Sequence, residues 1–264
     1  ITLIEDNGLG GSAVIDDCVP SKSFIAGANV KTDLRRAEDM GLSMKLAEDA
    51  AGAGSIRLVT ALNSRVRQLA GKQSNDIYRS VKRAGVRIIA GRGTFDDYNL
   101  NQTVHYIRVE HANGTVETIE CYLVLVATGA SPRILPGAQP DGERIVTWQQ
   151  IYNITELPEH LIVVGSGVTG AEFVSAFAEL GVKVTMVASR DRILPHDDAD
   201  AADVLETVLT ERGVSLVKHA RVDSVVRMDD GGVLVRTSDG REIRGSHALM
   251  TVGSIPNTQN MGVE

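Results

Sequence analysis

The chain has 264 residues, of which 43% are hydrophobic and 4% aromatic, and its 27 lysines and arginines against 34 aspartates and glutamates give a net charge of −7. An acidic chain does not attract phosphate backbones or anionic lipid, which argues against nucleic acid and membrane surfaces as partners, and no apolar run approaches the roughly 20 residues of a membrane span. Two cysteines, Cys18 and Cys121, do not suggest a disulfide framework, so a reducing cytoplasm is the expected compartment.

The first half of the chain predicts alternating strands and helices. It opens on Ile1–Ile4, a run typical of a buried strand, so we expect the chain to start inside a domain. After a glycine-rich segment, apolar residues recur every three or four positions, or multiples of these, over 58–81 and predict one face of a long helix. Further strands are predicted at 86–90, 104–110, 115–121 and 123–127, the middle two as a hairpin and the last as a buried strand.

The second half of the chain repeats this order. A predicted strand at 161–164 runs into the glycine-rich turn 165–170, and a helix over 168–180 closes at Gly181 before a strand at 184–187. A second helix is predicted from the stripe Val204, Leu205, Val208 and Leu209. The remaining predictions are a strand at 214–217, a hairpin over 233–243 that turns at Asp239-Gly240, and a strand at 247–252.

The two halves can be overlaid. Hairpin Gly114 precedes Gly129 by 15 positions, hairpin Gly240 precedes Gly253 by 13, and a proline follows each later glycine three positions on. Unrelated α/β units share strand and glycine punctuation, but the common order favours an internal duplication of a nucleotide-binding unit. The overlay also predicts that the first unit's own glycine turn lies about 18 residues before residue 1. We therefore expect the first strand and first phosphate loop to be missing from this chain.

A GxGxxG motif, Gly165-Ser166-Gly167-Val168-Thr169-Gly170, joins a predicted strand to a predicted helix. In such a motif Gly165 permits the tight turn, Gly167 lets the backbone approach a pyrophosphate, and Gly170 lets the helix pack on the strand. The context favours a dinucleotide site over a bare structural turn. In the first unit Glu5 ends the matching strand, where an acid accepts hydrogen bonds from a ribose diol, although a solvated strand-end charge is the alternative.

Four motifs in order resemble the flavoprotein disulfide reductase family. Residues 10–22 retain the second cysteine and the Pro-Ser-Lys of the family's GGxCxxxxCxPSK, and the others are similar to its ATGxxP, GxGxxGxE and GRxPNT at 127–132, 165–172 and 253–258. The resemblance covers essentially the whole chain. It implies an α/β fold of two Rossmann-like nucleotide-binding units, truncated at both ends, which bind FAD and NAD(P).

One departure from the family pattern matters most. Ala13 occupies the position of the first redox cysteine, so Cys18 has no partner five residues back, and Cys121 is interpreted as a buried core thiol. Disulfide shuttling needs two thiols within bridging distance, so we expect this chain to be unable to perform it. The glycine-rich segment and the motif at 161–173 most resemble an actinobacterial branch of lipoamide-dehydrogenase-like NAD(P)H:quinone reductases, which implies electron transfer from a nicotinamide through FAD to a quinone.

The resemblance also implies roles for individual residues. Lys22 would lie beside the reactive flavin nitrogen and pair with Glu172, although a surface lysine and a first-turn helix acid are the alternatives. Cys18 would contact the flavin face, either as a charge-transfer donor or as a residual structural thiol. The glycine turn 165–170 would hold the nicotinamide dinucleotide. The other residues implied for FAD are Gly10, Gly11, Ala127, Thr128, Gly129 and Gly253.

The end of the strand at 184–187 bears on the choice of nicotinamide cofactor. Where an NAD enzyme places an acid, this chain has Ala188 and Ser189, followed by Arg190 and Arg192. A serine and an arginine can both bind a 2′-phosphate, so we predict NADPH over NADH, with both cofactors usable. The alternative is that the arginines are solvated loop charges partly neutralised by Asp191. The six histidines show no ligand spacing, so no metal is predicted.

These expectations combine into one hypothesis. Residues 1–143 would form an incomplete FAD domain, 144–252 the NAD(P) domain, and 253–264 the return to the FAD domain. The full protein would be a cytoplasmic FAD-dependent NAD(P)H dehydrogenase of the quinone type, a homodimer through a C-terminal domain outside this chain. The alternatives are a dihydrolipoamide-dehydrogenase-like disulfide reductase and a nucleotide-binding redox module without turnover.

Overall fold

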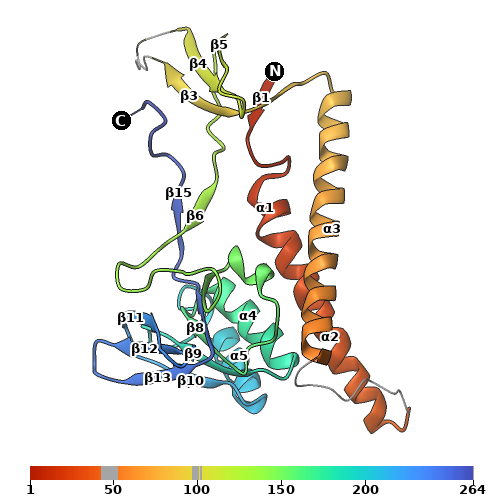
Figure 1. Ribbon diagram of the computed structural model, residues 1–264, viewed down its shortest axis with the longest axis vertical. Coiled ribbons are helices and arrows are strands. Elements are labelled where there is room, and N and C mark those ends of the chain that lie inside the picture. The colour runs from red at the N-terminus through yellow and green to blue at the C-terminus, as the bar shows by residue number, and fades with distance from the viewer. Residues whose placement is uncertain (43–52, 97–100, 102, 264) are drawn as a thin grey trace. The chain divides into compact units, whose positions relative to one another are not determined.

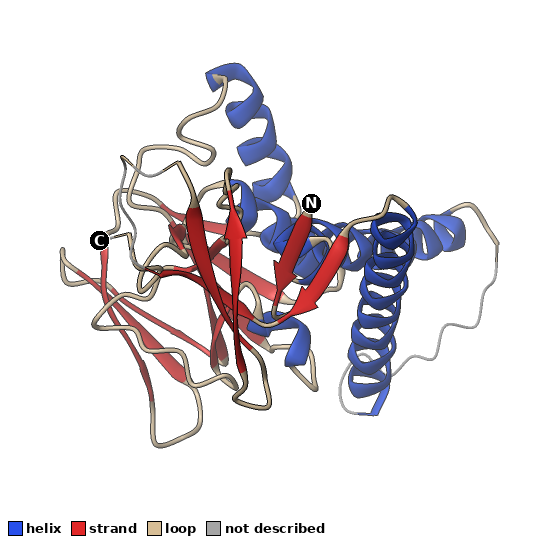
Figure 2. Ribbon diagram, turned by 90° about the horizontal axis from the view of Figure 1, so that it is seen from above, coloured by secondary structure: helices blue, strands red, loops and turns tan. Residues whose placement is uncertain are grey.

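The computed structural model describes residues 1–42, 53–96, 101 and 103–263, and it contains both helices and strands (Figure 2). Contacts divide the chain into two compact units. Unit 1 consists of Ile1–Asp16, Ala70–Ser131 and Ile255–Glu264, and unit 2 of Asp17–Leu69 and Pro132–Ser254. The assignment of 1–143, 144–252 and 253–264 to particular nucleotides stays a prediction, because these units follow contacts within the chain.

Unit 2 is built on a five-stranded parallel sheet in the order β10-β9-β8-β14-β7. The strands are β7 (Ile145–Thr147), β8 (His160–Val164), β9 (Lys183–Val187), β10 (Ser215–Val217) and β14 (His247–Met250). The central strands are apolar along nearly their whole length, as is typical of a parallel sheet covered on both faces. A parallel sheet of this kind confirms the predicted α/β class.

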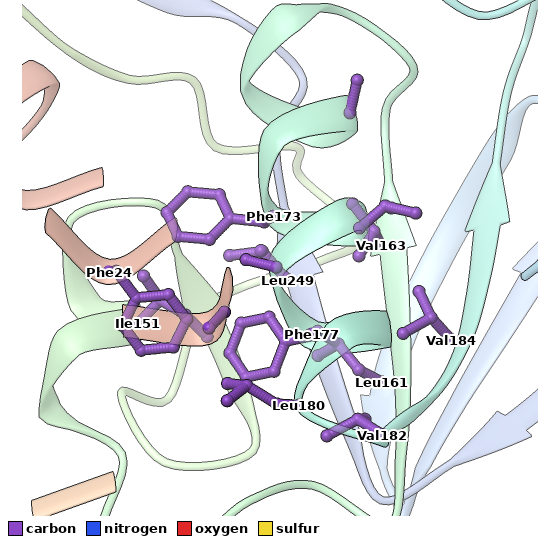
Figure 3. Packing of buried hydrophobic residues seen from close by; sticks show 14 of the residues in the cluster. Phe24, Ile151, Leu161, Val163, Phe173, Phe177, Leu180, Val182, Val184 and Leu249 are labelled. Carbon is purple, nitrogen blue, oxygen red and sulfur yellow. The ribbon is translucent and has the colours of Figure 1, made fainter. Parts of the chain in front are cut away.

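Helices from distant parts of the sequence share the main core of unit 2. They are α2 (Cys18–Asp39), the first part of α3 (Ala53–Arg83), α4 (Val168–Glu179), α5 (Ala199–Glu211) and the short η1 (Gln150–Asn153). Phe24 of α2 lies 5.3 Å from Phe177 of α4 between ring centroids, and both are almost fully buried beside Ile151 (Figure 3). Burial of such a ring contributes about 3 kcal/mol or more, so this contact fixes α2 on α4.

A three-stranded antiparallel sheet packs beside the parallel one in unit 2. It consists of β11 (Val222–Arg227), β12 (Val233–Thr237) and β13 (Glu242–Gly245), and its buried side chains form one cluster with those of β8 and β14. The hairpin between β12 and β13 turns at Gly240, whose φ is +85°, as the Asp-Gly pair predicts.

Unit 1 repeats part of the same order. In it β1 (Thr2–Glu5) pairs in parallel with β2 (Arg87–Ala90), and β3 (Arg92–Asp96), β4 (His105–Glu110) and β5 (Val116–Cys121) form an antiparallel sheet. The short α1 (Gly11–Ile15) also belongs to it. The division between the units falls, along the sequence, within the long helix α3 (Ala53–Arg83) and within the paired strands β6 (Ala130–Pro132) and β15 (Ser254–Pro256), all labelled in Figure 1.

The predicted buried strand at 123–127 is wrong for this structure. The segment is extended but unpaired, and Leu123 and Leu125 are 87% and 88% exposed. In unit 2, β8 lies between β9 and β14; the corresponding segments of unit 1 are β1 and 123–127, and no strand of the described residues of unit 1 corresponds to β8. Among the described residues no strand therefore lies beside the segment to accept or donate its backbone hydrogen bonds.

Other predictions need smaller corrections. Ile1 is fully exposed and β1 is only half-buried, and among the described residues β1 pairs with β2 alone. On α5 the buried face runs through Ala202 and Leu209, whereas Val204 is 66% exposed. Strand β11 is an element that the sequence did not predict. None of the described helices combines the length and apolar character needed to cross a membrane.

Candidate functional site

The turn between β8 and α4 shows why two glycines of the GxGxxG motif are required by the fold. Gly165 has φ of +116°, and a Cβ there would lie 2.3 Å from the Thr251 carbonyl oxygen, while a Cβ at Gly170 would lie 2.3 Å from the Gly165 carbonyl oxygen. Both positions exclude a side chain because backbone atoms occupy the space. The Thr251 hydroxyl donates to the Val164 and Gly165 carbonyls at 2.9 and 3.3 Å and supports the turn.

Gly167 differs from the other two glycines. A Cβ at this position would have no atom within 4 Å, and the backbone is ordinary and extended, so the fold itself does not demand glycine there. It is the N-cap residue of α4, whose first amides are free of the helix ladder and carry the positive end of the helix dipole. Open space beside such amides is what a pyrophosphate requires, so this turn fits a dinucleotide.

The loop that follows β9 lies next to this turn. The Leu194 amide donates to the Ser166 carbonyl at 2.7 Å, which ties the end of the loop to the glycine motif. Ala188 is buried at the end of β9, so no acid is present there, and Ser189 and Arg190 are exposed while Arg192 is half-buried. Among the described residues neither arginine has an ion pair. The loop therefore offers a hydroxyl and two uncompensated cations close to the dinucleotide turn.

The structure brings Lys22 and Glu172 together within unit 2. The Lys22 Nζ lies 2.5 Å from Glu172 Oε1 and 3.4 Å from the hydroxyl of the buried Ser21. Lys22 belongs to α2 and Glu172 to α4, which the Phe24–Phe177 contact holds side by side. The pair predicted from the resemblance thus forms between residues 150 positions apart.

Cys18 and Asp17 lie at the start of α2. Cys18 is an exposed free thiol, and its carbonyl accepts from the Ser21 hydroxyl at 3.5 Å. Burial raises the pKa of the Asp17 carboxyl above its usual range; the Lys22 ammonium partly offsets this rise and the Glu172 carboxylate adds to it. Sequence reasoning missed Asp17, although an acid directly before the motif cysteine was a visible signal.

Three of the predicted FAD-binding residues of unit 1 are glycines with a left-handed backbone. Gly10 and Gly11 have φ of +105° and +59° at the start of α1, and Gly129 has φ of +71°. Asn257 holds the segment at 128–129, since its Nδ2 donates to the Thr128 carbonyl at 3.0 Å and its amide to the Gly129 carbonyl at 2.9 Å. These glycines can present backbone amides to a ligand, although the described residues of unit 1 contain no glycine turn equivalent to 165–170.

The remaining predicted residues have local roles in the structure. One oxygen of Glu5 accepts from the Asn7 and Gly8 amides at 2.9 and 3.2 Å, which leaves the other available for a ribose. Ala127 is exposed, and in unit 2 the Gly253 carbonyl accepts from the Arg133 amide at 2.9 Å. Cys121 is half-buried at the end of β5, less buried than predicted, and its thiol lies 3.6 Å from the His105 carbonyl oxygen as a donor. The described residues contain no cluster of three or more side chains suited to a metal ion.

Comparisons with known proteins identify a family and several relatives of this chain. The family model described as pyridine nucleotide-disulphide oxidoreductase matches residues 1–264. The chain is 54% identical to a protein of Mycobacterium tuberculosis named NAD(P)H dehydrogenase (quinone), over 100% of this chain and 52% of that protein. It is 30% identical to a dihydrolipoyl dehydrogenase of Bacillus subtilis, over 99% of this chain and 55% of that protein.

Solved structures are similar over the same region. The crystal structure of LpdA from Mycobacterium tuberculosis matches with a TM-score of 0.90 and 53% identity, over 99% of this chain and 54% of that one. The flavoprotein disulfide reductase RclA of Escherichia coli matches with a TM-score of 0.74 at 23% identity, over 97% of this chain and 52% of that one, a likeness of fold alone. The chain thus spans about half the length of the relatives it matches.

Proposed function

Since the chain belongs to the pyridine nucleotide-disulphide oxidoreductase family, we propose that the full protein passes electrons from NAD(P)H through FAD to a quinone-type acceptor without a redox disulfide. One observation carries this proposal: the chain keeps the Lys22–Glu172 pair but has no cysteine five residues before Cys18. Ala13 stands at the position of the family's first redox cysteine. A relative named for quinone reduction supports the same acceptor class.

The Lys22–Glu172 pair supports electron transfer through a flavin. FAD supplies the electron-carrying chemistry when it is bound, and its reduced form is anionic. The Lys22 ammonium provides a fixed positive charge, which stabilises negative charge in its vicinity. Glu172 fixes the direction of the lysine side chain, and α2 and α4 fix both residues through their shared core. These residues therefore favour the reduced state of a flavin at this place.

The glycine turn and the loop after β9 support binding of the nicotinamide cofactor. The α4 N-terminus and the open position at Gly167 fit the pyrophosphate. Ser189, Arg190 and Arg192 fit a ribose 2′-phosphate, because a hydroxyl donates one hydrogen bond and guanidinium groups bind phosphate in a bidentate manner. We propose on this basis that NADPH is preferred and that NADH is also used.

Two other activities remain as competing proposals. A disulfide reductase is favoured by the dihydrolipoyl dehydrogenases among the relatives, but it needs a thiol to resolve a bond to Cys18. A nucleotide-binding module without turnover would need neither the Lys22–Glu172 pair nor an acceptor. For the full protein we also propose a cytoplasmic location. We further propose a homodimer whose interface lies in a domain outside this chain, since the relatives are about twice as long as the chain.

Absorption spectroscopy of the full-length, FAD-loaded protein tests the proposed activity. NADPH is expected to bleach the flavin band, and a small quinone is expected to restore it over many cycles. Lipoamide and glutathione disulfide are expected to leave the reduced band unchanged. Robust lipoamide turnover that depends on Cys18 would establish the disulfide reductase instead, and absence of bleaching would establish the binding module.

A further inference from the structure

The loop that carries Ser189, Arg190 and Arg192 is fastened by one carboxylate. Glu206, on α5, accepts the Ile193 amide hydrogen on Oε1 at 2.9 Å, and its Oε2 forms an ion pair with Lys218. The Glu206 side chain is only 14% exposed. A single side chain therefore joins the loop after β9 to the turn after β10.

The turn after β10 fastens the same loop through its backbone. The His219 amide donates to the Arg190 carbonyl at 3.1 Å, and the Ala220 amide donates to the Ala188 carbonyl at 2.8 Å. Arg241 in turn donates to the Lys218 and His219 carbonyls at 3.2 and 3.0 Å. The backbone that carries Arg190 is thus held on both sides of the residue.

The charges in this region divide into two groups. Lys218 is compensated by Glu206, and Arg241 by Asp239. Among the residues that the structure describes, Arg190 and Arg192 have no such partner. Lys218 and Arg241 therefore stabilise the local structure, and the other two arginines remain available to bind an anion.

We infer that Glu206 is a positioning residue that sets discrimination for the 2′-phosphate of the nicotinamide cofactor. The inference rests on the proposed use of NADPH. Both carboxylate oxygens of Glu206 already have partners, the Ile193 amide and Lys218, and these contacts fix the backbone that carries Arg190 and Arg192. When the backbone is already fixed, only the arginine side chains remain to be ordered by the phosphate, which lowers the entropic cost of binding.

The experiment compares two nucleotides that differ in the 2′-phosphate. Affinities of the full-length, FAD-loaded protein for 2′,5′-ADP and for 5′-AMP are measured by calorimetry, and their ratio reports the phosphate alone. The variants are Glu206→Ala and the double variant Glu206→Ala/Lys218→Ala, which removes one charge of each sign and leaves the net charge unchanged. Glu211→Ala, on the exposed face of the same helix, is the matched control.

We expect the double variant to lose about 10-fold in affinity for 2′,5′-ADP while its affinity for 5′-AMP stays within about twofold of the wild type. In steady-state assays KM for NADPH should rise with kcat unchanged, and KM for NADH should not move. An equal loss for both nucleotides, or a ratio equal to that of Glu211→Ala, would overturn the inference. If the wild type binds both nucleotides equally, the proposed NADPH preference fails and the inference about Glu206 fails with it. This outcome is seen in the wild type alone, so it differs from the two outcomes above, which are seen in the variants.

Discussion

Removal of the Lys22–Glu172 ion pair is expected to leave the free energy of unfolding almost unchanged. At 2.5 Å in water the Coulomb energy of two unit charges is about 1.7 kcal/mol, and fixing a lysine side chain costs up to about 2 kcal/mol. The Lys22 side chain is 59% exposed, so water screens the pair from the lysine side even though the Glu172 side chain is only 23% exposed. The net contribution should be about 0–1 kcal/mol, as for other exposed pairs.

The same substitutions should have a large effect on electron transfer. Lys22→Met removes the positive charge proposed to stabilise a reduced flavin, and loss of one such group costs roughly 100-fold in rate. A double-mutant cycle with Lys22→Met and Glu172→Gln, followed by urea unfolding, gives the coupling free energy, and stopped-flow absorbance gives the rate of flavin reduction by NADPH in the full-length protein. Stability and rate are thus expected to separate.

Lys31→Met is the matched control for this prediction. Lys31 is also on α2, and its ammonium donates to the Leu180 carbonyl at 2.6 Å, so its removal should lower stability slightly and leave the rate of flavin reduction unchanged. A coupling free energy above about 2 kcal/mol would mean that the Lys22–Glu172 pair is structural. Equal losses of rate in Lys22→Met and Lys31→Met would also refute the reasoning.

Three further results are expected from substitutions in unit 2. Gly170→Ala should lower the free energy of unfolding by about 1–3 kcal/mol, because its Cβ meets the Gly165 carbonyl, and a urea melt identical to the wild type would contradict this. Gly167→Ala should instead change the free energy of unfolding by less than about 1 kcal/mol, since its Cβ meets no protein atom. The same Cβ would occupy the space proposed for the pyrophosphate, so NADPH binding, measured by fluorescence titration, should weaken. Burial, with the Arg144 guanidinium as a second cause, lowers the pKa of His247 to about 4. The unfolded chain then binds the extra proton first, so stability should fall by at most about 3 kcal/mol as the pH drops from 6.5 to 4, and His247→Gln should flatten this dependence in urea melts across that range.

The sequence predicted most accurately the elements whose limits are set by neighbouring residues. Strand β8 and helix α4 lie within about one residue of their predicted bounds, because an apolar run, the glycines of the turn and Gly181 define them locally. Gly181 has φ of +82° after the helix, the left-handed conformation that ends many helices. The ordered motifs predicted, through the family resemblance, the fold of two nucleotide-binding units and the pairing of Lys22 with Glu172. Spacing along the chain alone could not indicate that pairing.

Strand β11 was missed because its pattern is irregular. Val225 is buried and its neighbour Val226 is 38% exposed, but the register shifts between Val222 and Ser224, so the apolar residues do not alternate cleanly. Its pairing with β12 is what makes it a strand, and that partner begins several residues later in the chain. A bulge of this kind becomes evident only when both strands are in place.

Segment 123–127 shows how far a strand depends on its neighbours. Its sequence, Leu-Val-Leu-Val-Ala, is at least as apolar as that of β14, which occupies the corresponding place in unit 2. Strand β14 pairs with β7 on one side and β8 on the other, and all four of its residues are buried, whereas 123–127 has no strand beside it among the described residues. An apolar run specifies that a segment can be buried in a sheet, but the hydrogen bonds that make it a strand belong to the adjacent chain. The glycine turns show the same dependence, because the turn at 165–170 is supported by Thr251 after β14, whereas the described residues of unit 1 hold Gly10, Gly11 and Gly129 without an equivalent strand pair.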